Sequence, residues 1–274
     1  MAVIKFERKP GTPPPGQFRP SSPPPGFALS KNFVPLLALL LVSGIMLYSG
    51  MIGSRPLVFA FVVAGWVISL CLHEFGHALA AYYGGDRSVE AKGYLTLDPF
   101  AYSHWVNSIL FPVIILALGG LGLPGGAVYI NHDALRSKAW DSFVAAAGPL
   151  GTLFCLLVLA VPLWLGLDET YGKPDFWAAW HMLAYIEVSA LVLNLLPIPG
   201  FDGFNIIRPW LPPQMQRQAQ AIAQISFFIF FALLMAMPSV NYALFNMIYI
   251  ASQPFGIGFA EVIDGLKLFR FWNW

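Results

Sequence analysis

Two histidines and a glutamate stand close together in an apolar stretch of the sequence: His73, Glu74 and His77. Histidines four residues apart on a helix differ by about 40° of rotation, so both imidazoles can reach one metal ion, with the glutamate beside it. This spacing is typical of zinc hydrolases. Ionisable groups inside an apolar span are costly and generally mark a water-accessible functional site, which favours a metal centre over a chance match.

A catalytic zinc site normally takes three protein ligands and leaves a fourth position for water, so a third ligand is expected from another apolar region. The candidates for this ligand are Asp202, Glu187, His181, His104 and His132. Asp202 follows two prolines, Pro197 and Pro199, which interrupt a helix and release backbone groups just before the carboxylate. Irregular backbone at membrane depth is tolerated where it lines a wet cavity, and a metal site is such a cavity.

The composition places these residues in a membrane protein. Of the 274 residues, 57% are hydrophobic and only 11% are charged, against about 25% charged residues in soluble domains. One soluble core cannot bury this much apolar surface. The formal net charge is only +1, so there is no basic surplus and we expect no nucleic-acid partner. Cys71 and Cys155 lie in apolar runs and form neither a zinc-knuckle nor a disulfide pattern.

About 20 apolar residues suffice to cross a bilayer. Five stretches meet this length, at 33–53, 57–83, 140–167, 176–197 and 220–237. Two further stretches, 106–123 and 240–253, are ambiguous. The polar stretch 84–105 includes Ser88 to Leu97, whose loose alternation can pair as a short β-hairpin. We therefore expect an all-α polytopic membrane protein with about six transmembrane helices, a re-entrant segment and this short hairpin.

The two ends of the chain differ from its apolar middle. Residues 1–32 contain eight prolines and five basic residues but no apolar region of a secretory signal, so we expect a disordered, proline-rich cytoplasmic tail. Residues 33–253 are expected to form one integral, multi-pass domain in the lipid bilayer. Residues 254–274 mix aromatic and charged side chains, as an interfacial segment does.

The His73–His77 motif and the segment Asn194-x-x-Pro-x-Pro-x-x-Asp202-Gly203 together resemble the paired signature of the site-2 protease family of intramembrane zinc metalloproteases. Two further segments, Ala147-Gly148-Pro149 and Leu95-Thr-Leu-Asp-Pro99, are similar to segments of its small, domain-free bacterial members. The resemblance covers residues 57–205. It implies a three-helix metalloprotease core and one Zn²⁺ per chain, held by His73, His77 and Asp202, with Glu74 as the catalytic base.

The sequence departs from the family pattern at two places. Thr152 stands where Asn commonly follows Ala-Gly-Pro, and Tyr102-Ser103-His104 replaces a more usual His-x-Asp. Both departures leave the implied metal ligands intact and concern the substrate-facing details.

Two polar residues of the span 176–197 can each be interpreted in two ways. Asn194 can donate a hydrogen bond to the oxyanion or to the substrate backbone, or it can bond a neighbouring helix. Glu187 lies seven positions earlier on nearly the same helical face. It can face the active-site interior, or it can be a proton-bearing or paired carboxylate within the bundle.

The distribution of basic residues and the number of membrane crossings predict the orientation of the protein in the membrane. If the basic tail is cytoplasmic, His73 and His77 lie in the cytoplasmic half of their span, and Asp202 must also lie near that face. This requires 106–123 to dip into the membrane and return. The basic residues of the tail and loops then divide eleven inside against two outside, Arg55 and Lys173, in agreement with the positive-inside rule.

The leading hypothesis is a zinc-dependent intramembrane endopeptidase that cuts transmembrane segments of other proteins, in a bacterial plasma membrane. Because an intact transmembrane helix hides its peptide bonds in internal hydrogen bonds, such a substrate must unwind locally before cleavage. One alternative is a catalytically silent, zinc-binding membrane adaptor, which would not need Glu74. Another is an ion-coupled transporter that uses Glu187 and Asp202, for which inverted repeats would be expected and none is found.

Overall fold

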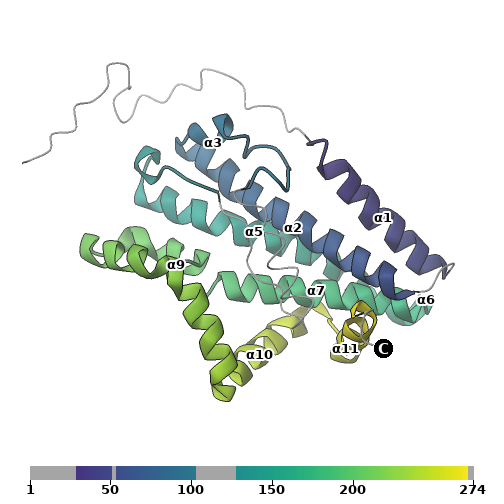
Figure 1. Cartoon of the computed structure of the whole chain (residues 1–274). Coiled ribbons are helices and arrows are strands. Elements are labelled where there is room, and N and C mark those ends of the chain that lie inside the picture. The colour runs from purple at the N-terminus through teal and green to yellow at the C-terminus, as the bar shows by residue number, and fades with distance from the viewer. Residues whose placement is uncertain (1–28, 51–53, 103–127, 271–274) are drawn as a thin grey trace, which may run out of the picture.

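The computed structural model describes residues 29–50, 54–102 and 128–270. Helices account for the regular secondary structure in these ranges (Figure 1). The longer helices are α1 Phe33–Ser49, α2 Ser54–Gly84, α5 Lys138–Trp164, α7 Pro174–Asn194, α9 Pro213–Ala236, α10 Pro238–Ser252 and α11 Phe259–Phe269. The shorter elements are α3 Ser88–Ala91, η2 His132–Ala134, α6 Leu167–Tyr171, α8 Asp202–Ile207, η3 Arg208–Trp210 and η4 Gln253–Phe255.

Helix α2 is the centre of the fold and packs against α1, α5 and α7 (Figure 1). Val144 of α5 contacts His77 of α2, whereas the later Thr152 contacts the earlier His73. Helices α2 and α5 are therefore antiparallel. Helix α7 runs parallel to α2, because Glu187 bonds Ser69 and the C-terminal end of α7 lies at the level of His73. The three helices of the expected core are thus in mutual contact.

The structure supports some of the membrane-spanning helices that the sequence predicts. Within the described residues, α2 from Arg55, α5 and α7 are long and apolar enough to cross a membrane. A fourth crossing is added if α9, which bends by 67° between Ala223 and Phe228, counts as one span. Helix α1 is apolar but has 17 residues, the lower limit for a crossing. Helix α10 has 15. By length and composition, the described residues thus support three or four of the roughly six spans expected.

The predicted hairpin at Ser88 to Leu97 is wrong. Residues Ser88–Ala91 form helix α3, and turns follow it. The buried carboxylate of Asp86 explains this result: Oδ1 accepts the backbone N–H of Ser88 at 3.0 Å, and Oδ2 accepts that of Asn131 at 2.7 Å. Asp86 therefore starts the helical turn and ties it to the segment before η2. Sequence alternation carried no information about this distant partner.

The two flanks of the polar stretch meet at one end of the bundle. The backbone N–H of Arg136 donates to the carbonyl of Gly84 at 3.0 Å, and the indole of Trp140 donates to the carbonyl of Ala80. The chain thus leaves α2 and enters α5 on the same side. The segment 106–123 lies outside the described residues, so its re-entrant course stays a prediction.

The expected tail also lies mostly outside the described residues, which begin at residue 29. Its last residues are held in place: Ser30 donates to the carbonyl of Leu97, and the amide of Asn32 donates to both carboxylate oxygens of Asp98. The start of α1 is therefore attached to the loop that follows α3.

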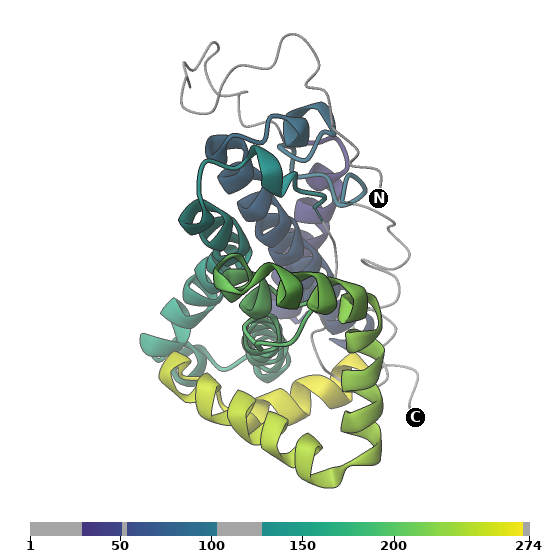
Figure 2. The same cartoon turned by 90° about the vertical axis from the view of Figure 1, so that its left-hand side faces the viewer.

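The C-terminal third adds a second group of helices. Figures 1 and 2 show α9 and α10 meeting at an angle away from the α1–α2–α5–α7 bundle. Helix α11 packs on α7 and α2. Gly265 of α11 lies so close to α7 that an added Cβ would be 2.3 Å from the carbonyl oxygen of Ala178. The described part of 254–274 is therefore packed on the bundle, and its interfacial role stays a prediction.

Candidate metal centre

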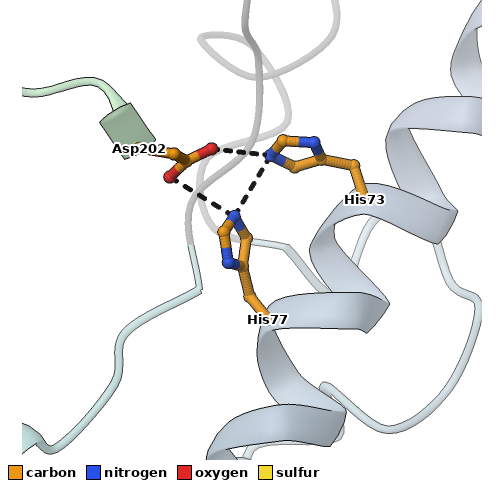
Figure 3. A group of neighbouring side chains, drawn as sticks. All are labelled: His73, His77 and Asp202. Atoms are coloured by element: carbon orange, nitrogen blue, oxygen red, sulfur yellow. Dashed lines mark hydrogen bonds and ion pairs between the residues drawn. The ribbon is translucent and has the colours of Figure 1, made fainter. Parts of the chain in front are cut away.

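Three potential ligand atoms converge between α2 and the start of α8 (Figure 3). The Nε2 atoms of His73 and His77 lie 3.1 Å apart. The carboxylate of Asp202 lies across from both, with Oδ2 at 3.1 Å from His73 Nε2 and Oδ1 at 3.4 Å from His77 Nε2. Among the described residues, this is the group of histidine, cysteine and acidic side chains able to hold one metal ion.

These spacings fit zinc. With zinc–ligand bonds of about 2.0–2.1 Å, a tetrahedral site separates its ligand atoms by about 3.3 Å. The two histidine nitrogens lie 3.1 Å apart, and each has one carboxylate oxygen of Asp202 nearby, Oδ2 at 3.1 Å from His73 and Oδ1 at 3.4 Å from His77. The space before the two nitrogens is kept open by Gly148 of α5. A Cβ atom there would lie 2.2 Å from His77 Nε2 and 2.7 Å from His73 Nε2. The structure thus provides both the donors and the room that the ion needs.

The other ring nitrogen of each histidine is held by α5. His77 Nδ1 lies 2.8 Å from the carbonyl oxygen of Val144. Because a carbonyl only accepts, this nitrogen carries the proton and donates it, which leaves the Nε2 lone pair free for a metal. His73 Nδ1 lies 2.9 Å from the hydroxyl oxygen of Thr152. Such outer contacts orient metal-binding histidines.

The turn after α7 positions Asp202. Phe201 donates its backbone N–H to the carbonyl of Ile198, and Gly200 has a φ of 101°, which favours glycine. Gly203 allows α8 to start against the end of α7, since a Cβ there would lie 2.2 Å from the carbonyl oxygen of Leu195. The residue types around Asp202 thus follow from a tight reversal of the chain.

Asp202 supplies the acidic member of this group. Both of its carboxylate oxygens face the histidine Nε2 atoms, and a carboxylate binds a metal ion in its deprotonated form.

Glycines bring α2 and α5 unusually close at the motif. An added Cβ at Gly76 would lie 2.5 Å from the carbonyl oxygen of Ala147, and one at Gly151 would lie 2.8 Å from that of Leu72. This approach brings Val144, Gly148 and Thr152 within reach of the two histidines.

Comparison with known proteins decides the family. The chain is 42% identical over 251 residues to "Putative zinc metalloprotease Rip2" of Mycolicibacterium smegmatis, with 89% of this chain and 94% of the relative aligned. It is 40% identical over 248 residues, with the same coverage, to the protein of that name in Mycobacterium tuberculosis H37Rv. This chain belongs to the site-2 protease family of zinc metalloproteases. The predicted family and its zinc cofactor are thereby confirmed.

A more distant relative of this site-2 protease is "Putative zinc metalloprotease YwhC" of Bacillus subtilis, 29% identical over 197 residues, with 69% of this chain and 85% of the relative aligned. No family model matches the chain. No solved structure matches it either.

Two further predicted site residues of the protease are buried near the metal centre. Glu74 is 3% exposed, interacts electrostatically with His73, His77 and Asp202, and its Oε2 has no hydrogen-bond partner among the described residues. Asn194 is buried at the end of α7 and lines a small cavity beside His73.

The structure does not place the other third-ligand candidates in the ligand cluster. Glu187 bonds Ser69. His181 is buried, with Nε2 at 3.0 Å from Asp168 and Nδ1 accepting the backbone N–H of Gly258. His132 forms an ion pair with Asp141. His104 lies outside the described residues.

Sequence reasoning missed the roles of two α5 residues in this protease. From the sequence, Gly148 stood out only as part of the Ala147-Gly148-Pro149 segment and Thr152 only as a departure from the family pattern. A signal was present, since Gly148 belongs to this family-like segment and Thr152 lies three residues after Pro149. Their contacts with His73 and His77 depend on the register between α2 and α5, which the sequence does not display.

Proposed function

We propose that this site-2 protease is an intramembrane endopeptidase that hydrolyses peptide bonds in or near transmembrane segments of other membrane proteins. The observation that carries the proposal is the depth of the metal centre. Helix α2 has 31 residues, and His77 and His73 lie 7 and 11 residues before its last residue, Gly84, which is about 10 and 16 Å along the axis. The centre is therefore within the membrane-crossing part of the chain.

The proposed ligands are His73, His77 and Asp202. Zinc held by them would lower the pKa of a water ligand towards about 7 and polarise the substrate carbonyl. Glu74 is the proposed catalytic base: its buried, unpartnered Oε2 accepts a proton from the attacking water and then delivers it to the leaving amine. Asn194 is assigned to binding the substrate carbonyl oxygen or backbone.

The substrate must present an extended peptide to this centre. A helical segment keeps its carbonyl groups in internal hydrogen bonds, so the cleaved region has to unwind first. Substrate segments with helix-destabilising residues such as Gly, Pro or Asn are therefore expected to be cut faster than uniform Leu-rich segments.

The proposed location is a bacterial plasma membrane with the N-terminus in the cytoplasm. The eleven-to-two distribution of basic residues supports this orientation. The meeting of Gly84 and Arg136 at one end of the bundle supports the even number of crossings between α2 and α5 that it requires.

Cleavage by the Glu74→Gln variant tests the proposal. A single-span substrate is co-expressed with wild type and with the variant, and cleavage and bound zinc are measured together. We expect cleavage to fall by a factor of at least about 100 while one zinc per chain is retained. Cleavage at the wild-type rate by Glu74→Gln would contradict the assignment of the base. Zinc without cleavage in the wild type would favour the silent adaptor.

A further inference from the structure

A small cavity lies beside His73. It has a volume of about 10 Å³ and lies between α2, α5 and α7. Its polar lining consists of Ser69, His73, Thr152, Glu187 and Asn194. A cavity needs about 10–15 Å³ and two to four polar partners to hold one ordered water, and this cavity provides both.

Glu187 offers an unused acceptor to this cavity. Its side chain is 1% exposed, and the hydroxyl of Ser69 donates to Oε2. The second oxygen, Oε1, is buried without a hydrogen-bond partner among the described residues. Buried carboxyl oxygens are nearly always hydrogen-bonded, because leaving one unpaired costs free energy. Oε1 therefore identifies a donor position that water can fill.

Thr152 offers an unused donor. Its side chain is 3% exposed, and in the described part of the chain His73 Nδ1, at 2.9 Å, is the hydrogen-bond partner of its hydroxyl. If Nδ1 donates its proton, the Thr152 oxygen accepts it, and the hydroxyl proton remains to be donated elsewhere. Since Thr152 and Glu187 line the same cavity, one water can connect them.

We propose that Glu187 is a positioning residue for His73, acting through one buried water and Thr152. In this chain of hydrogen bonds, His73 donates to Thr152, Thr152 donates to the water, and the water donates to Glu187. In its carboxylate form Glu187 only accepts, so the water donates to it and keeps a lone pair that can accept the Thr152 hydroxyl proton. With the bonds in this direction the Thr152 oxygen accepts the proton of His73 Nδ1, and Nε2 is left for the metal.

The arrangement is an extended form of a carboxylate–histidine–metal contact, in which an outer carboxylate fixes the tautomer and the ring orientation of a ligand. It also gives Thr152 a role. Its hydroxyl oxygen accepts the proton of His73 Nδ1, and its own proton is donated towards Glu187 through the water, so Thr152 links the two side chains. The inference rests on the proposed function to the extent that His73 is taken as a zinc ligand.

Zinc affinity in a double-mutant cycle tests the connection. The full chain is purified in detergent, stripped with a chelator and titrated with zinc against a competing chelator. The variants are Glu187→Gln, Thr152→Val and their combination, which preserve side-chain size. Thr152→Ser retains the hydroxyl. Ser189→Ala is the matched control, because Ser189 is equally buried on α7 but bonds the carbonyl of Tyr185.

We expect each single variant to weaken zinc binding about 10- to 100-fold, and the double variant to bind no more weakly than Thr152→Val, because one missing member already breaks the chain. Thr152→Ser and Ser189→Ala should bind zinc as wild type does. Wild-type affinity in Glu187→Gln, or losses that multiply in the double variant, would overturn the proposal. If Glu187→Gln does not fold, Glu187→Asp takes its place in the cycle, with the same criteria.

His73→Ala separates this inference from the proposed function. If His73→Ala loses zinc and Glu187→Gln does not, only the role of Glu187 is wrong. If His73→Ala binds zinc like the wild type, His73 is not a ligand, and both the proposed ligand set and this inference fail.

Discussion

Gly148 of α5 faces His77 of α2 so closely that a Cβ atom on the glycine would lie 2.2 Å from the Nε2 atom of the histidine. His77 cannot readily turn away, because its Nδ1 atom is held by the carbonyl of Val144 at 2.8 Å. Helix α5 thus makes two kinds of contact at the candidate metal centre: Val144 and Thr152 bond the histidine rings, and Gly148 has no side chain to fill the space before their Nε2 atoms.

Gly148→Ala is therefore expected to damage the metal centre more than the fold. The added methyl group overlaps both ligand nitrogens, so zinc affinity should fall by at least about 10-fold and cleavage should fall with it. Metal analysis and thermal unfolding of the purified protein check this. Leu150→Ala is the control, since Leu150 is exposed on the same helix and should retain zinc. Full zinc content in Gly148→Ala would show that the ligands lie elsewhere.

Asp202→Asn tests the third ligand. The amide keeps the shape of the side chain but loses the negative charge that faces His73 and His77. We expect bound zinc to fall from one per chain to a small fraction. Chelator treatment followed by zinc should restore cleavage by the wild type but not by the variant. Stoichiometric zinc in Asp202→Asn would exclude this carboxylate as a required ligand.

Because of Tyr102, we expect the stability of the folded protein to fall as the pH rises through the alkaline range. Its hydroxyl donates to the carbonyl of Thr96 at 2.8 Å and lies 3.3 Å from that of Cys71. Burial, together with the nearby Cys71 and Glu74, raises the pKa of Tyr102 above its ordinary value. The folded state thus favours the neutral phenol, and this stabilisation is complete below the ordinary pKa of about 10 and is lost as pH rises above it.

The measurement compares wild type with Tyr102→Phe. At pH 8 the variant should be less stable by about 1–2 kcal/mol, because it loses the bond to Thr96. The difference in melting temperature between the two proteins should shrink as the pH rises from 9 to 11. Comparison of the two proteins cancels the titration of other tyrosines and lysines. A difference that stays constant with pH would contradict the prediction.

The orientation can be tested with single cysteines at exposed positions. Ser137→Cys lies at the start of α5, next to the end of α2, and Tyr171→Cys lies in α6, at the opposite end of α5. In intact cells, an impermeant thiol reagent should label position 171 and not position 137. Cys71 and Cys155 are replaced by Ala for this experiment. The opposite labelling pattern would reverse the orientation, and labelling at neither position before lysis would require another topology.

Much of the metal centre follows from local sequence. Histidines at i and i+4 share a helix face whatever surrounds them, which is why His73 and His77 were predictable as a pair. The prolines before Asp202 marked an interrupted helix in the same way. The apolar stretches likewise predicted α2, α5 and α7, because about 20 apolar residues leave few alternatives to a membrane helix.

Long-range contacts account for what sequence reasoning missed. Ser88 to Leu97 was expected to form strands, but Asp86 bonds Asn131 across 45 positions and favours a helical turn. The stretch 220–237 was expected to be a span, and the bend of α9 between Ala223 and Phe228, where Ser226 bonds the carbonyl of Pro199, was not foreseen. Neither partner is near in sequence, so periodicity could not reveal it.

By itself, the sequence determined that the chain is a helical membrane protein and the family to which it belongs, and it predicted the residues of the candidate zinc site. These properties depend on composition and on spacing along single helices. Only the tertiary structure decided what surrounds the histidines: Gly148 opposite the two Nε2 nitrogens, Val144 and Thr152 at the Nδ1 atoms, and Glu187 in the lining of the same cavity as Thr152. Such contacts arise from the register of α2, α5 and α7, which is set by close packing at glycines, and no local pattern encodes that register.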